Sequence, residues 1–220
     1  MHRSYLLMIA TLVALAFNTG PATAESDNAQ NTPRVGDPYP LKVDPLGASL
    51  VDVEEPIVVI HEGRELQFTD EANVAKFNIA PDKYLTQVDA LIIAQQKQNY
   101  PLKSCPVSGQ ELGKMGGPVD LVYGNRLVRL CCGGCEGALK KETARHFEKI
   151  DAAVIEQQQA DYPLETCVIS GEKLGMMGEP ADYVIGTQLV RFCCPGCMSK
   201  FEKAPARYLQ VIETKDTAVE

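Results

Sequence analysis

Eight cysteines fall in two groups of four with identical spacing. Each group has one cysteine, then 25 other residues, then a vicinal pair, two further residues and a last cysteine. Cysteine thiolates are good ligands for borderline and soft metal ions such as Zn(II) and Cu(I). The spacing therefore predicts two thiolate metal sites, about two ions per chain, drawn from these residues: Cys105, Cys131, Cys132 and Cys135 in one group, and Cys167, Cys193, Cys194 and Cys197 in the other.

Two other uses of these cysteines remain open. In an exported protein they could form disulfides that stabilise a small binding module. The segments 132–135 and 194–197 are also Cys-x-x-Cys pairs at an expected helix start, as in thiol–disulfide oxidoreductases. No βαβ pattern precedes either pair, and the chain has no nucleophile triad or phosphate-binding loop, so we expect a protein that is not an enzyme.

The chain is built from one repeat written three times. Residues 100–139 and 162–201 align without a gap and agree at 21 of 40 positions. A third copy begins at Tyr39-Pro40-Leu41 and has no cysteine. We place the units at 36–97, 98–159 and 160–213, followed by a C-terminal tail at 214–220. In the first unit the cysteine positions are occupied by Asp44, Thr69, Asp70 and Asn73.

The elements that must position the cysteines repeat in each unit. In the second unit, two short strands at 119–123 and 126–131 flank Gly124-Asn125, which suits a tight hairpin turn. A short helix should follow at 132–141, and then a second, amphipathic helix, opened by Pro81 in unit one and by Pro205 in unit three. The fold class predicted is α+β, a tandem array of three small ββα units. A unit of about 60 residues needs a neighbour, a disulfide or a metal for stability.

The motif Tyr-x4-Cys-Pro-Val-x-Gly, a hairpin and then Arg-Leu-Cys-Cys-x-Gly-Cys resembles the YHS and TRASH families. Pro205-Ala-Arg-Tyr208 is similar to the ending of YHS domains. The resemblance implies treble-clef-like modules that bind heavy metals for trafficking or sensing. It implies as ligands Cys105, Cys131 and Cys135 in one unit, and Cys167, Cys193 and Cys197 in the other.

The sequence departs from these families at one ligand position. Many relatives have a second cysteine in the upstream turn, where this chain has Ser108 and Ser170, and its extra cysteines are Cys132 and Cys194. Four thiolates suit tetrahedral Zn(II), whereas two or three suit Cu(I). Adjacent side chains on a strand point to opposite faces. We therefore expect three ligands with an optional fourth.

The N-terminus predicts export to the periplasm or the exterior. Residues 1–24 have the plan of a secretory signal peptide, with an apolar run and an Ala-Thr-Ala cleavage site, and residues 25–38 are expected to be a disordered leader. The formal charge of −8 disfavours nucleic-acid and anionic-lipid partners. The partners expected are metal ions and a protein that donates or accepts them. Met115 and Met177 are expected to fill a small core, and His146 to be an aromatic residue at the core edge.

Overall fold

The computed structural model describes residues 33–216. The predicted signal peptide, most of the predicted leader and residues 217–220 lie outside these described residues. The described part is a mixed α+β structure with six α-helices and three two-stranded antiparallel sheets. None of its helices is long and apolar enough to cross a membrane.

The three sheets are β-hairpins of equal length. They are formed by β1 (Ile57–His61) with β2 (Arg64–Phe68), β3 (Val119–Tyr123) with β4 (Arg126–Leu130), and β5 (Ala181–Ile185) with β6 (Gln188–Phe192). In the second hairpin both turn residues, Gly124 and Asn125, have positive φ, at 54° and 64°. This is the backbone that a two-residue hairpin turn requires. The hairpin is confirmed, with its second strand ending one residue earlier than predicted.

Each hairpin is followed by a short helix and then a longer one. The short helices are α1 (Glu71–Ile79), α3 (Glu136–Lys141) and α5 (Met198–Lys203), the last two preceded by single 3-10 turns at Gly133–Cys135 and Pro195–Cys197. The long helices are α2 (Pro81–Lys97), α4 (Thr143–Gln158) and α6 (Pro205–Asp216). Pro81 and Pro205 open their helices as predicted, because the first helical position does not need a backbone N–H.

Every hairpin packs on its own two helices through equivalent residues. The last apolar residue of the second strand contacts the short helix, and the contact pairs are fully buried: Phe68 with Phe77, Leu130 with Leu139, and Phe192 with Phe201. The long helix adds an apolar residue at matching positions, namely Val88, Ile150 and Ile212. The repeat in the sequence is thus a repeat in the cores.

The long helices join each unit to the next. The side chain of Gln96 accepts a hydrogen bond from Leu127 N at 2.7 Å and donates to Asn125 O at 3.1 Å. One unit later, Gln158 makes the same pair of bonds to Leu189 N and Thr187 O, both at 2.8 Å. Each of these glutamines therefore fixes the following hairpin at its turn.

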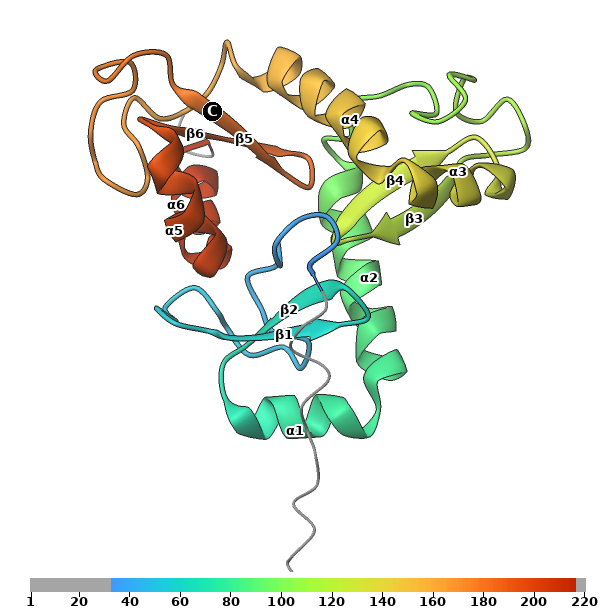
Figure 1. The fold of residues 1–220 in the computed structure, drawn as a ribbon, viewed down its shortest axis with the longest axis horizontal. Coiled ribbons are helices and arrows are strands. Elements are labelled where there is room, and N and C mark those ends of the chain that lie inside the picture. The colour runs from blue at the N-terminus through green and yellow to red at the C-terminus, as the bar shows by residue number, and fades with distance from the viewer. Residues whose placement is uncertain (1–32, 217–220) are drawn as a thin grey trace, which may run out of the picture.

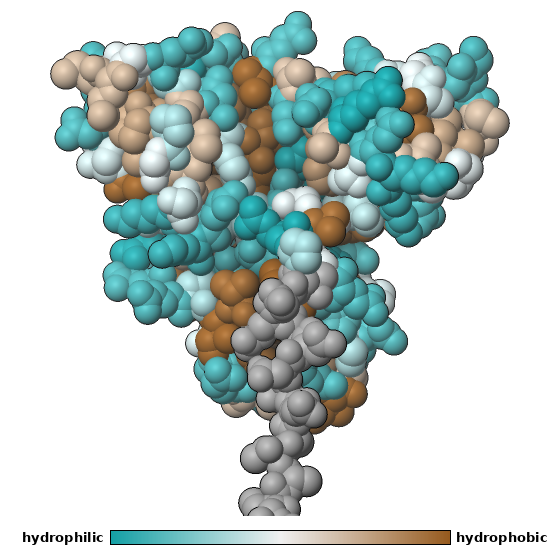
Figure 2. All heavy atoms as spheres, in the orientation of Figure 1, coloured by the Kyte–Doolittle hydropathy of each residue, from teal (hydrophilic) through white to brown (hydrophobic). Residues whose placement is uncertain are grey.

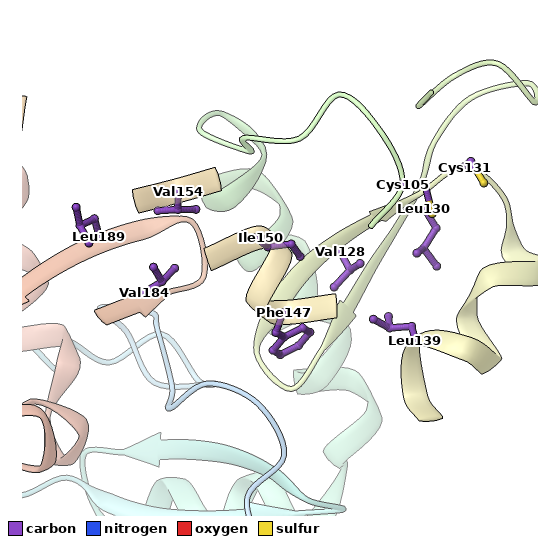
Figure 3. Packing of buried hydrophobic residues seen from close by; sticks show 10 residues of the cluster. All are labelled: Cys105, Val128, Leu130, Cys131, Leu139, Phe147, Ile150, Val154, Val184 and Leu189. Carbon is purple, nitrogen blue, oxygen red and sulfur yellow. The ribbon is translucent and has the colours of Figure 1, made fainter. Parts of the chain in front are cut away.

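Apolar packing strengthens the junction between the second and third units. Val184 and Leu189 from the third hairpin lie against α4 in the same cluster as Ile150 and Val154 (Figure 3). The space-filling view shows apolar atoms in the seam between these two units, and further apolar patches over the first unit (Figure 2).

The third unit returns to the first, so the three units close into a ring (Figure 1). Gln67 on β2 donates to the backbone oxygens of Glu202 and Lys203, at 3.4 and 3.3 Å. Ala206 of α6 belongs to the core of the first unit. An ion pair between Lys42 and Glu213 adds a further connection.

The end of the expected disordered leader is ordered, which corrects that prediction for residues 35–38. Asp37 is 7% exposed and its carboxylate binds Arg126 Nε and Nη2, at 2.9 and 2.8 Å. It also accepts a hydrogen bond from Gly186 N at 2.6 Å. Asp37 therefore joins the second hairpin to the third.

Candidate metal centres

The upstream cysteine of each group lies in a tight turn held by backbone hydrogen bonds. Cys105 N donates to Gln110 O, and Gly109 N donates to Cys105 O, both at 2.8 Å. Gly109 has a φ of 74°, which a residue without a Cβ adopts most readily. The turn at Cys167 repeats this pattern, with Cys167 N donating to Glu172 O at 2.8 Å.

The hairpin and the short helix bring two further cysteines to each turn. Cys131 follows the last residue of β4 and Cys135 ends the 3-10 turn before α3. The Sγ atoms of Cys105, Cys131 and Cys135 all lie within 4.8 Å of one another, and so do those of Cys167, Cys193 and Cys197. We call these two groups triad two and triad three, after their units.

The spacing of the sulfurs fits a bound ion. The Sγ atoms of Cys131 and Cys135 are 3.7 Å apart, and those of Cys193 and Cys197 are 3.8 Å apart. Two thiolates on one tetrahedral zinc ion, with Zn–S bonds of about 2.3 Å, have sulfurs about 3.8 Å apart. The triads contain no histidine or carboxylate, so the donor set is entirely sulfur and favours soft or borderline ions.

The triads lie at the edge of the apolar cores. Cys105 and Cys131 are 1% and 2% exposed and belong to the core cluster of the second unit (Figure 3). In the third unit all three triad members are buried, whereas in the second Cys135 is partly exposed. A bound ion would thus be largely shielded from water.

A serine beside each triad stabilises a thiolate. Ser108 Oγ lies 3.2 Å from Cys131 Sγ, and Ser170 Oγ lies 3.3 Å from Cys193 Sγ. Burial raises the pKa of Cys105, but hydrogen bonds from the Ser108 hydroxyl and from backbone amides outweigh it and lower that pKa to about 6. For Cys167, burial is likewise outweighed by backbone amides and the Ser170 hydroxyl, which lower its pKa to about 7.

The last cysteine of each triad has a raised pKa, in contrast to the first. Burial, together with the neighbouring thiols, raises the pKa of both Cys135 and Cys197 to about 12. In a metal-free triad the first cysteine therefore ionises readily, whereas the last stays protonated. A cation supplies the charge that allows this last thiol to ionise, so binding should release protons.

The fourth cysteine of each group lies beside the triad. The Sγ atom of Cys132 is 4.0 Å from that of Cys131, and the Sγ atom of Cys194 is 3.9 Å from that of Cys193. Both residues have an extended backbone and are partly exposed. The backbone N–H of Gly196 lowers the pKa of Cys194. Of the eight predicted ligands, the structure brings six into triads and places two at their margins.

The first unit has a hydrogen-bonded cluster where the others have a triad. Asp44 Oδ2 accepts hydrogen bonds from Asn73 Nδ2 at 2.7 Å and from Thr69 Oγ1 at 3.0 Å. Asn73 Nδ2 also donates to Thr69 Oγ1 at 3.1 Å. These three residues occupy the positions of Cys105, Cys131 and Cys135. We call them the Asp44 cluster.

Two expectations about residues near the triads have different outcomes. Met115 and Met177 are 63% and 67% exposed, so the prediction that they fill a core is wrong. Their loops have several glycines at positive φ and run outside the packed part of each unit. His146 is 4% exposed, as predicted for a core-edge aromatic, and its Nδ1 lies 3.1 Å from Pro106 O, next to Cys105.

Comparisons with protein-family models, with curated proteins and with solved structures find no significant match to this chain. The resemblance to the YHS and TRASH families therefore rests on the motif residues alone. Functional inference depends on the geometry of the two triads.

Proposed function

We propose that this protein binds soft or borderline metal ions as cargo, one ion in each triad. The observation that carries the proposal is the convergence of three thiol sulfurs within 4.8 Å in two separate units. Turn, strand end and helix start each supply one sulfur, although the first lies more than 20 residues from the others in sequence. Such convergence of thiols is what a thiolate metal site requires.

Copper and zinc are the ions that fit the donor set best. Three thiolates without nitrogen or oxygen donors suit Cu(I), which tolerates low coordination numbers. Zinc would need a fourth ligand, which a water molecule or the adjacent Cys132 or Cys194 could supply. Titration of the reduced chain with Cu(I) and with Zn(II) in competition with chelators of known affinity would rank the two ions.

The proposal also covers the type of module to which the units belong and the location of the protein. We assign the units to treble-clef-like modules of the YHS or TRASH type, the first having lost its ligands. The predicted signal peptide supports a location in the periplasm or outside the cell, where the protein would hold or pass on metal or protect against it. N-terminal sequencing of the protein from an exporting host should find Glu25 first, after cleavage at Ala24. An intact Met1 on soluble, folded protein would contradict this location.

A count of thiols and metal tests the proposal against the disulfide alternative. Protein purified from an exporting host without reductant should carry metal and yield its thiols on denaturation with a chelator. Full disulfide bonding with no metal would instead support a disulfide-stabilised binding module. Reversible exchange between Cys132 and Cys135 with a substrate protein would support the oxidoreductase alternative.

A further inference from the structure

The two cysteines outside the triads, Cys132 and Cys194, lie between the triads and solvent. Cys132 and Cys194 each begin a 3-10 turn with φ near −160°, so the side chain leaves the strand on the face opposite to its vicinal partner. Their sulfurs nevertheless remain 4.0 and 3.9 Å from that partner's sulfur. The same placement occurs in both metal units.

In the third unit, exposure separates Cys194 from the triad. Cys193 and Cys197 are 2% and 9% exposed, and Cys167 is 1% exposed, so triad three has no sulfur at the surface. Cys194 is partly exposed and lies next to it. Among the sulfurs of this unit, Cys194 is the one that an incoming ion meets first.

We propose that Cys132 and Cys194 are exchange ligands that pass a metal ion between a sulfur-bearing donor or acceptor and the triad. This inference rests on the proposed function, because it assigns a role at the same sites. In loading, the exposed thiol loses its proton to solvent and its thiolate bonds to the ion, and one donor ligand leaves. The triad thiols then lose their protons to solvent and bond to the ion as thiolates while the remaining donor ligands leave, the bond to the exchange cysteine breaks, and that sulfur regains a proton. No electron is transferred.

The second and third units should differ in how strongly they depend on this step. In triad two, Cys135 is itself partly exposed and offers a second route for the ion. In triad three every member is buried. Loss of Cys194 should therefore slow metal exchange more than loss of Cys132.

The test compares Cys132→Ser and Cys194→Ser in the full mature chain, fully reduced. Cu(I) held by bicinchoninate is the probe for loading, and stopped-flow absorbance follows its release to the protein. Both variants should still bind two ions. Cys194→Ser should slow one of the two loading phases by about tenfold, in line with the effect of residues that adjoin metal ligands, and Cys132→Ser by less.

Alkylation provides a second readout that does not depend on folding of a variant. Iodoacetamide should modify Cys132 and Cys194 first in the metal-free chain, as located by peptide mass spectrometry. The modified protein should load slowly, whereas metal bound before alkylation should stay bound. Unchanged loading rates in Cys194→Ser and in the alkylated chain would refute the exchange role.

The remaining outcomes separate this inference from the proposed function. If Cys194→Ser binds only one ion, Cys194 is a permanent ligand and the exchange role is wrong, while metal binding stands. If the unmodified reduced chain binds no Cu(I) and no Zn(II), the proposed function fails, and the exchange role fails with it.

Discussion

The first unit and the two cysteine-bearing units have different side chains at the positions where an upstream turn meets the start of a short helix. All three must hold an upstream turn against the start of a short helix. In the first unit the Asp44 carboxylate does this through hydrogen bonds to Thr69 and Asn73. In the other two units the equivalent positions carry thiols, which are weak hydrogen-bond partners.

The comparison shows that the fold itself does not require metal ligands. In the first unit, hydrogen bonds between oxygen and nitrogen atoms of the Asp44 cluster hold the upstream turn against the short helix. The three thiols in each of the other two units therefore support the proposed metal binding. It also predicts that these two units are the ones whose stability depends on an ion.

Removal of metal should have the largest effect, and it should fall on the second and third units. Structural zinc contributes on the order of 10 kcal/mol in small domains, which equals the whole stability of many domains. Chelation under reducing conditions should loosen residues 98–213 and leave residues 39–97 protected. Hydrogen exchange measured with and without chelator would show the contrast. Equal protection in all units after complete metal removal would show that the triads do not stabilise their units.

Much of this contrast could be predicted from the sequence because the repeat is regular. The 62-residue offset aligned all three hairpins, and Gly124-Asn125 indicated the turn type. The same alignment placed Asp44, Thr69 and Asn73 at cysteine positions, although it did not indicate that they bond to one another. The position shared by Tyr84, His146 and Tyr208 gave the correct burial for His146.

Other features of the structure were not predicted from the sequence. Asp37 is a single acidic residue in a polar segment, and only tertiary structure shows that it meets Arg126. Gln96 and Gln158 belong to glutamine-rich segments that resemble linkers, yet they lie in the last turns of helices and bind the next hairpin. Their equal spacing in the repeat was the available signal. Met115 and Met177 were misplaced because apolar character alone does not show that a glycine-rich loop leaves the core.

The difference between the units can be tested by introducing a cysteine triad into the first unit. In the variant Asp44→Cys, Thr69→Cys and Asn73→Cys, the three thiols replace side chains whose bonded atoms already lie within 3.1 Å of one another. This variant should bind a third ion, as measured by native mass spectrometry. The matched control keeps Asn73 and changes only the other two residues, and it should bind two. A triple variant that is folded but binds only two ions would show that sulfur placement alone does not make the site.

Removal of the Asp44 carboxylate from the Asp44 cluster should destabilise the first unit. Asp44 is 1% exposed and its Oδ1 also accepts hydrogen bonds from Leu46 N and Ala48 N, both at 2.9 Å. Asp44→Ala leaves buried donors unpaired and should cost about 3 kcal/mol of unfolding free energy. Asp52→Ala, at an exposed position nearby, should change it by less than about 0.5 kcal/mol. Denaturant unfolding would measure both, and equal effects would contradict a stabilising role for the Asp44 cluster.

Substitution of the serine beside a triad should have a smaller effect, which is a change in the pKa of a triad cysteine. Ser108→Ala removes a hydrogen bond that favours the Cys105 thiolate, so the pKa of Cys105 should rise from about 6. Loss of one hydrogen bond worth about 1 kcal/mol corresponds to a rise of about one pKa unit. Alkylation rates of Cys105 as a function of pH, resolved by peptide mass spectrometry in the metal-free chain, would report the change. Ser104→Ala removes a neighbouring hydroxyl and should leave the profile in place; a shift of the same size in both would contradict a specific role for Ser108.

The most direct test of the central claim is the metal content of the full mature chain and two single variants. Native mass spectrometry of reduced protein loaded with Cu(I) or Zn(II) should find two ions per chain. Cys135→Ser and Cys197→Ser should each bind one ion, because each removes a member of one triad and leaves the other intact. Two ions in both variants, or none in the unmodified chain with every thiol available, would contradict the account.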